Sequence, residues 1–200
     1  MTHLINCYCG SGMFCIGPLL RFDTCIGIKI NEVAISEARE NTVSNGVSNR
    51  NFVAASTEAT FSSEVPINAS SVINDGRGED DCGKDNEKKI GSLLVHDLTP
   101  DMMVVVVDPS RKGYSVEFLD QLNEYQPARV VYMSCDPAPQ ERDAKLLISF
   151  GYRISSIQLF NLFPQTPQMR HIECLAVFER MDDGDVKIMG YYVKWARWCG

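Results

Sequence analysis

The sequence contains no long apolar run and no excess of basic residues. No stretch approaches the roughly 18–20 consecutive apolar residues that a membrane-spanning helix needs, so we expect no contact with a membrane. The N-terminal residues MTHLINCYCGSGMF lack the charged start and the long apolar core of a secretory signal. Lys and Arg number 19 against 26 Asp and Glu, and the formal net charge of -7 argues against strong nonspecific binding to nucleic acid.

Paired metal ligands are also missing. Of the eight cysteines, Cys7 and Cys9 form a close pair, but no second Cys or His pair lies at a spacing that completes a zinc site. Without a secretory signal, the thiols are expected to be reduced rather than paired in disulfides. We therefore expect an intracellular protein without a metal, in the cytoplasm, the nucleus or the mitochondrion.

The composition that remains is that of an ordinary globular chain. Its 200 residues are 44% hydrophobic and 22% charged, which suits one domain of common size. Residues 62–89 depart from this composition, because a stretch so rich in Ser, Asn, Asp, Glu and Gly cannot offset the entropy of ordering it. We expect a domain over 1–180 with a disordered acidic insertion at about 62–90, and a tail, 181–200, that has no clear place in it.

Strand and helix patterns alternate along the rest of the chain. Strands are expected at 3–7, 24–30, 51–55, 102–107, 129–133, 152–160 and 172–179, and helices at about 13–20, 31–45, 115–124 and 138–149. The run MMVVVV is typical of a central strand buried on both faces. In the helix at 31–45, Asn31 is the expected N-cap, and the expected apolar stripe consists of Val33, Ala34, Ile35 and Ala38. The alternation predicts a doubly wound α/β sheet.

Two motifs follow expected strands, and ligands of open α/β sheets bind where strands end. In Cys7–Gly12 (CYCGSG), glycines at a strand-to-helix turn let a ligand approach the backbone and the helix N-terminus. A simple tight turn is the alternative. In Asp108–Gly113 (DPSRKG), the apolar run places an acid at a strand end, where an aspartate that only caps a helix is the alternative.

Two further motifs contain candidates for covalent and acid–base chemistry. Cys135, in SCDP, precedes an expected helix, whose dipole and amides stabilise a nucleophilic thiolate. A buried core thiol is the alternative. Glu173, in HIE, opens an apolar strand and is a candidate general base if it is partly desolvated. An exposed charge before the strand is the alternative.

The order and spacing of these motifs resemble the RNA uracil-5-methyltransferases, most of all the eukaryotic tRNA branch. The resemblance covers about residues 3–180 apart from the insertion, in the segments CYCGSGMF, GIKIN, ARENTVSNGVSNRNF, VDPSRKG, YMSCDPAPQERD and LFPQTPQMRHIE. It implies a Rossmann-like, class I methyltransferase fold with a mostly parallel sheet and an antiparallel final strand. It also implies that S-adenosylmethionine is the cofactor, and that the product is 5-methyluridine in RNA, in particular tRNA. A cytosine-C5 or adenine methyltransferase fits less well, because the elements DPSRKG and HIE do not look like theirs.

The resemblance also assigns roles to single residues. Cys135 matches the nucleophile that adds to uracil C6, and Glu173 matches the base that removes the C5 proton. Asp108 matches an acid near the reacting base and the cofactor. The residues that match the cofactor-binding positions are Tyr8, Gly10, Gly12, Lys29 and Asp108, and those that match a loop-orienting pair are Arg142 and Asp143.

The chain departs from the family pattern at Asn6, Lys29, Ser110, Asp136 and Asn161. An ammonium at Lys29 only donates, whereas the usual carboxylate accepts two ribose hydroxyls, so we expect weaker cofactor binding. A carboxylate at Asp136 is expected to disfavour the neighbouring thiolate. The family's upstream RNA-binding domain is also not in the sequence. A second hypothesis is therefore a truncated or degenerate, inactive domain that serves as an RNA-associated or interaction module.

Overall fold

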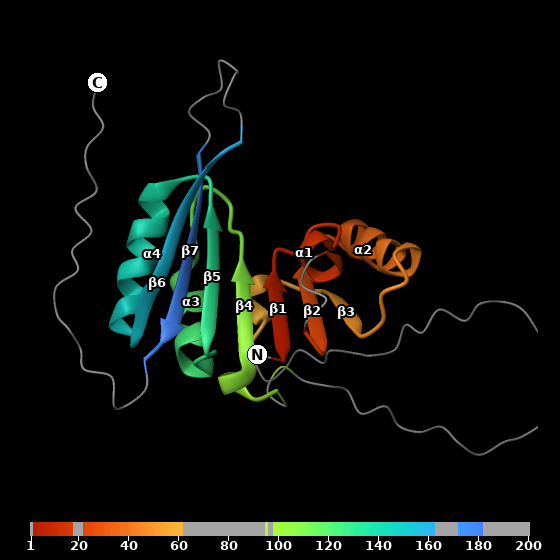
Figure 1. The fold of residues 1–200 in the computed structure, drawn as a ribbon, viewed down its shortest axis with the longest axis horizontal. Helices are drawn as coiled ribbons and strands as arrows, with labels where there is room; N and C mark the ends of the chain where they lie inside the picture. Colours follow the sequence, from red (N-terminus) through yellow and green to blue (C-terminus); the bar gives the residue numbers. More distant parts are fainter. Residues whose placement is uncertain (1, 18–21, 62–94, 96–97, 163–171, 182–200) are drawn as a thin grey trace, which may run out of the picture.

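The computed structural model describes residues 2–17, 22–61, 95, 98–162 and 172–181. These residues form a seven-stranded sheet in the order β3-β2-β1-β4-β5-β7-β6 (Figure 1). The strands are β1 (His3–Cys7), β2 (Thr24–Lys29), β3 (Arg50–Ala54), β4 (Met103–Val107), β5 (Arg129–Ser134), β6 (Tyr152–Asn161) and β7 (Ile172–Arg180). The helices are α1 (Met13–Ile16), α2 (Glu32–Ser44), α3 (Val116–Tyr125) and α4 (Pro137–Ser149), with short 3-10 turns at η1 (Thr57–Ala59) and η3 (Pro100–Met102).

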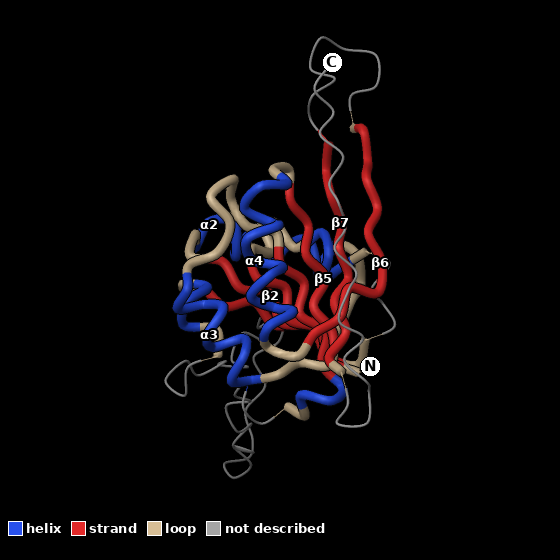
Figure 2. The backbone as a smooth tube through the Cα atoms, turned by 90° about the vertical axis from the view of Figure 1, so that its left-hand side faces the viewer, coloured by secondary structure: helices blue, strands red, loops and turns tan. Residues whose placement is uncertain are grey.

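The sheet is parallel from β3 to β5, and β7 runs antiparallel between β5 and β6. This confirms the expected doubly wound sheet with an antiparallel final strand. The carboxyl ends of β2, β1, β4 and β5 therefore lie along one edge, and the amino end of β7 meets them there. Beyond the end of β5, the β6–β7 hairpin continues as a two-stranded extension (Figure 2).

Two helical layers cover opposite faces of the sheet, because neighbouring strand residues point to opposite sides. On one face, α1 and α2 pack over β1 to β3 through Leu4, Cys15, Ile35, Ala38 and Phe52. On the other face, α3 and α4 pack through a larger cluster that includes Ile5, Val105, Phe118, Leu122, Tyr132 and Leu147. All five residues of β4 are buried, which confirms the central strand expected from the valine run.

Helix α2 shows where the apolar pattern was misleading. Asn31 caps it as expected, because its side chain accepts a hydrogen bond of 3.1 Å from the Ala34 amide. The expected stripe is wrong at Val33, which is 68% exposed. The buried residues Ile35, Ala38 and Thr42 are spaced by three and four, so they share one helix face that Val33 does not.

Other expected boundaries agree with the structure to within a residue or two, with one exception. The helix expected over 13–20 is short, because α1 ends at Ile16 and Gly17 is its C-cap. The expected insertion at 62–90, the tail except Met181, and the elements FPQT and His171 lie outside the described residues. In the described part of the chain no helix is long and apolar enough to span a membrane.

Candidate functional site

The turn after β1 has an unusual backbone. Tyr8, Gly10 and Gly12 all have positive φ, at 75°, 54° and 92°, a conformation that a tyrosine rarely adopts. The Tyr8 and Cys9 amides both donate to the carbonyl of Ile28, at 2.9 and 3.1 Å, which fixes the turn to β2. A Cβ on Gly12 would lie 3.1 Å from Ala38, whereas one on Gly10 would meet nothing within 4 Å. The turn is therefore closed towards α2 and open at Gly10, where a ligand has room.

Lys29, Tyr8 and Asp108 lie at the ends of the adjacent strands β2, β1 and β4. The Lys29 ammonium lies 5.1 Å from the centre of the Tyr8 ring, in a cation–π contact. Partial burial raises the pKa of the Asp108 carboxyl above its usual value, and the Lys29 charge opposes that rise. The structure thus brings together three residues that the sequence predicts at the cofactor site.

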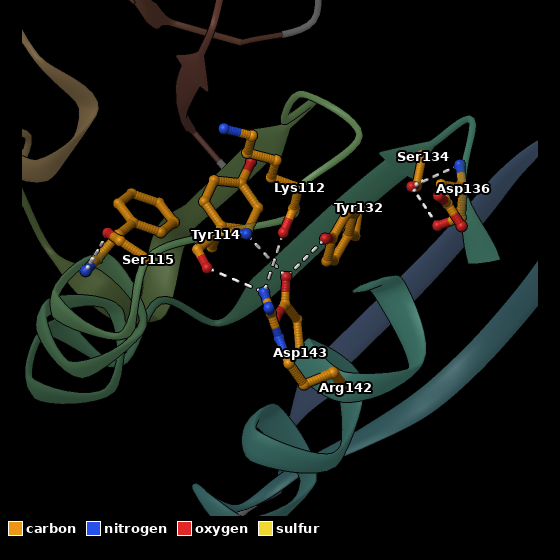
Figure 3. A network of polar contacts seen from close by, with 9 residues as sticks. Lys112, Tyr114, Ser115, Tyr132, Ser134, Asp136, Arg142 and Asp143 are labelled. Carbon is orange, nitrogen blue, oxygen red and sulfur yellow. Dashed lines mark hydrogen bonds and ion pairs between the residues drawn. The ribbon is translucent and has the colours of Figure 1, made fainter. Parts of the chain in front are cut away.

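The loop over 108–115, here called the Asp108 loop, is held against α4 by a network of hydrogen bonds around the buried Asp143 (Figure 3). Asp143, which is fully buried, accepts hydrogen bonds from the Tyr114 amide at 3.0 Å and the Tyr132 hydroxyl at 2.8 Å. Its second oxygen accepts from the Arg142 guanidinium at 2.8 Å, and Arg142 also donates to the Tyr114 carbonyl at 3.0 Å. Burial and the hydrogen bond to Asp143 raise the pKa of Tyr132, so this hydroxyl remains a donor. These contacts agree with the loop-orienting role expected for the pair.

Gly113 explains why the loop can approach α4 so closely. It has a φ of +75°, and a Cβ there would lie 2.7 Å from both the Arg142 guanidinium and the Asp143 carboxylate. No side chain fits at this distance without moving the network. The glycine that ends DPSRKG is therefore required by a tertiary contact as well as by the turn.

Cys135 lies between the end of β5 and the start of α4, as expected, and is half-buried. The neighbouring Asp136 is the N-cap of α4, because its carboxylate accepts a hydrogen bond of 3.1 Å from the Ala138 amide. Its own amide donates to the Ser134 hydroxyl at 3.1 Å. The carboxylate that was expected to oppose the thiolate thus has a structural role, and its effect on the thiol stays a prediction.

The β5–β7 register brings Glu173 and Cys135 to the same end of two adjacent strands. Ser134 pairs with Cys174 at the end of the ladder, so Cys135 and Glu173 are the next residues on the two strands. Glu173 is half-buried and pairs on its other side with Phe160 of β6. Together with the sheet order, this places Lys29, Tyr8, Asp108, Cys135 and Glu173 in that sequence along one edge.

Two structural features of this edge were not found from the sequence. Gln140 is buried on α4 and donates to the carbonyls of Tyr132 at 3.1 Å and Cys174 at 3.2 Å, which ties β5 to β7 just before Cys135. The only signal for it was a glutamine on the buried side of an expected helix. Asn6 is also fully buried, and its side-chain amide lies beside the Cys15 thiol, a weak partner, with no nitrogen or oxygen partner in the described part of the chain. Among these same residues no group of His, Cys, Asp and Glu is arranged to hold a metal ion.

Comparison with known proteins finds similar sequences among the uracil-C5 methyltransferases of RNA. The family model "tRNA (Uracil-5-)-methyltransferase" matches residues 92–181. Over 90% of its length the chain is 32% identical to a tRNA (uracil(54)-C(5))-methyltransferase of Schizosaccharomyces pombe, and over 89% it is 30% identical to that of Saccharomyces cerevisiae. A 23S rRNA (uracil(1939)-C(5))-methyltransferase of Shewanella frigidimarina is 30% identical over 88% of the chain. The chain spans only 28%, 23% and 31% of these three relatives.

Solved structures of methyltransferases also resemble this chain. The crystal structure of the Pyrococcus abyssi tRNA (uracil-54, C5)-methyltransferase in complex with S-adenosyl-L-homocysteine superposes with a TM-score of 0.60 at 29% identity, over 89% of this chain and 34% of that one. The N-methyltransferase NodS of Bradyrhizobium japonicum has a TM-score of 0.58 at 12% identity, over 90% of this chain and 79% of that one, so it shows the fold alone. The expected class I methyltransferase fold is confirmed.

Proposed function

We propose that this chain, which shares its sequence and fold with the RNA uracil-5-methyltransferase family, is the catalytic region of an enzyme that methylates uridine C5 in RNA. The observation that supports the proposal is the pairing of Ser134 with Cys174, because Cys135 and Glu173 are the residues that follow this pair at the same end of the two strands. A thiol and a carboxylate at adjacent strand ends are the two groups that this reaction requires.

The chemistry explains why both groups are needed. Uracil C5 is too weak a nucleophile to take a methyl group directly. Addition of the Cys135 thiolate forms a bond from sulfur to C6 and moves the electrons of the C5–C6 double bond into an enolate, which makes C5 nucleophilic. The first turn of α4, which follows Cys135, offers no free amide, because residues 137 and 139 are prolines and the Ala138 amide donates to the Asp136 carboxylate. Of the two contributions expected from this helix, only the dipole is left at the sulfur.

Release of the product requires a base. After C5 has been methylated, the C5–H bond breaks and its proton passes to Glu173. The electrons of that bond restore the C5–C6 double bond, and the sulfur leaves C6 as a thiolate. Glu173 is half-buried and lies on the strand adjacent to β5, which supports its proposed role in this transfer.

The β1 turn fits a cofactor in part. Bound S-adenosylmethionine supplies the methyl group in this family. The open side of the turn at Gly10 admits a ligand to the backbone, and Tyr8 and Asp108 flank it. Lys29 is the residue that fits least, because its ammonium lies over Tyr8 and cannot accept a hydrogen bond from a ribose hydroxyl. We therefore expect binding that is weaker than with a carboxylate at this position.

We further propose that the substrate RNA is tRNA. This rests on two of the three relatives above, whose names give tRNA uridine 54 as the target. The ribosomal RNA enzyme among the relatives makes rRNA the alternative outcome of the test.

Covalent trapping tests the proposal. The chain is incubated with S-adenosylmethionine and with tRNA or rRNA fragments that contain 5-fluorouridine. A base cannot remove the C5 fluorine as it removes the C5 proton, so the covalent adduct cannot be resolved. We expect a denaturation-resistant adduct that Cys135→Ala abolishes and that Cys174→Ala, which removes the neighbouring buried thiol, retains. With unmodified RNA, Glu173→Gln should accumulate an adduct that the parent chain resolves. An adduct that survives Cys135→Ala would overturn the assignment, and no adduct together with no cofactor binding would favour the inactive-domain hypothesis.

A further inference from the structure

The end of the β6–β7 hairpin next to Cys135 and Glu173 exposes large apolar side chains. Leu159 is 59% exposed, Phe160 44%, Leu162 56% and Ile172 39%. The hairpin reaches beyond the last residue of β5 (Figure 2), so among the described strands none covers this end. None of the four residues belongs to either core cluster. The burial of a core therefore does not explain why they are apolar.

A β-bulge in β6 determines which of these side chains lies opposite Glu173. Up to Ile154 the β6–β7 register pairs Tyr152 with Arg180, and from Ser156 onwards it is shifted by one residue. The shift pairs Phe160 with Glu173 and Leu159 with Cys174. Residues directly opposite in an antiparallel pair lie on the same face, with Cβ atoms about 4.5–5.5 Å apart. Phe160 therefore shares a sheet face with Glu173, and Leu159 points to the other face.

The resulting arrangement is a transverse row of three different groups. The strands β5, β7 and β6 are neighbours in the sheet. Cys135 directly follows β5, Glu173 is the second residue of β7, and Phe160 is the residue before the last of β6. With neighbouring strands about 4.8 Å apart, the two outer backbones are separated by roughly 10 Å. A nucleophile attacks within about 3–3.5 Å of its target, and the attack on C6 comes from one side of the ring plane. At this separation, side chains from the two outer strands can contact the same planar ring above Glu173.

We infer that Phe160 is the side chain on which the reacting uracil stacks, an inference that rests on the proposed function. An enzyme that attacks a base at C6 must first remove the base from its stack in RNA, at a cost of a few kcal/mol. Aromatic side chains that stack on an extruded base compensate for this loss, and truncating one weakens binding by roughly 5- to 150-fold. Phe160 is the exposed aromatic residue that the register places beside Glu173.

A thermodynamic cycle on binding tests the inference without any turnover. The affinity of the Cys135→Ala chain is measured by fluorescence anisotropy for two tRNA stem-loops, one with the target uridine and one with an abasic site there. Phe160→Ala is expected to weaken binding of the uridine RNA about 5- to 150-fold and to leave binding of the abasic RNA unchanged. Phe160→Tyr should restore the preference for uridine. The matched control is Leu159→Ala, on the opposite face of the same strand, which should alter neither RNA.

The outcomes separate this inference from the proposed function. A preference for uridine that depends on Phe160, without adduct formation in the trapping experiment, supports stacking and overturns the catalytic proposal. Adduct formation together with an unaltered preference in Phe160→Ala overturns the stacking role alone. Equal losses in Phe160→Ala and Leu159→Ala, or no preference for uridine in the parent chain, also overturn it. Unchanged thermal midpoints of both variants exclude misfolding as the cause.

Discussion

The two halves of the candidate site differ in how well their polar groups are satisfied. In the half that is proposed to bind the base, Asp143 and Gln140 are buried, and each makes two or more hydrogen bonds that tie α4 to the Asp108 loop or to the ends of β5 and β7. In the half that is proposed to bind the cofactor, the buried amide of Asn6 has no nitrogen or oxygen partner within the described residues and lies beside the weakly bonding Cys15 thiol. Lys29 contacts the face of Tyr8.

Departures from the family pattern fall in both halves. Asn6 and Lys29 lie on β1 and β2 in the cofactor half, whereas Ser110, Asp136 and Asn161 follow β4, precede α4 and end β6 in the other half. A buried network whose hydrogen bonds are all formed fixes one geometry, whereas a buried amide with poor hydrogen-bond partners costs stability and fixes no geometry. We therefore expect the base-binding half to be rigid and sensitive to mutation, and the cofactor-binding half to be improvable.

The largest expected effect is the loss of Asp143. Asp143→Ala leaves the Tyr132 hydroxyl, the Tyr114 amide and the Arg142 guanidinium without their acceptor. We expect a loss of about 2–6 kcal/mol in the free energy of unfolding, measured by urea denaturation, because the Tyr132 hydroxyl and the Tyr114 amide lose their acceptor at about 1–3 kcal/mol each. The Arg142 side chain is exposed and stays solvated. Glu141→Ala, which removes the exposed pair with Lys145 on the same helix, should cost at most about 0.5 kcal/mol. Similar losses in the two variants would contradict the importance of the network.

A glycine in each half gives the next comparison. Gly113→Ala introduces a Cβ at 2.7 Å from the Arg142 and Asp143 side chains, in addition to a positive φ. We expect it to destabilise the chain by about 2–4 kcal/mol. Gly10→Ala has the same sign of φ with open space around it, so only the backbone term of about 1–2 kcal/mol remains. Equal losses in unfolding free energy would show that packing against the network adds nothing.

Reversal of one charge in the cofactor half is expected to strengthen cofactor binding. Lys29→Glu replaces a donor by an acceptor at the end of β2, and a hydrogen bond from a ribose hydroxyl to a carboxylate contributes about 1.5–3 kcal/mol. Binding of S-adenosyl-L-homocysteine, measured by isothermal calorimetry, is expected to tighten at least about tenfold. Lys145→Glu makes the same charge change on the exposed side of α4 and should leave the affinity unaltered. An unchanged affinity in Lys29→Glu would remove this residue as the weak point of the site.

The smallest expected effect is the pH dependence contributed by Asp108. Partial burial raises the pKa of its carboxyl in the folded chain, so the folded state binds the proton more tightly than the unfolded state. Stability from this group is therefore present in acid and lost as the pH rises through the raised pKa. Asp108→Asn should flatten this decline, by a small amount because the residue is partly exposed. Unfolding midpoints measured from pH 3 to pH 7 check the sign, and a steeper decline in the variant would contradict it.

Much of the architecture was predictable because it depends on local patterns. The valine run of β4, the Asn31 cap and the alternation of strands and helices are properties of neighbouring residues, and the structure confirms them. Local patterns failed where a distant contact decided burial or role. Val33 is apolar but exposed, because α2 packs on the sheet through a different face. The Asp136 carboxylate caps the N-terminus of α4, a role that depends on where the helix begins.

The sequence by itself determined the fold class and the position of each motif at a strand end, since periodicity and turn residues act over a few neighbours. Only the tertiary structure decided which of these ends meet. The order of the strands brought Cys135 and Glu173 to the same end of adjacent strands, although 38 positions separate them in the chain. The bulge between Ile154 and Ser156 then placed Phe160, and not Leu159, opposite Glu173. A shift of one residue in register exchanges the two faces of a strand, and register is set by pairing across the whole sheet.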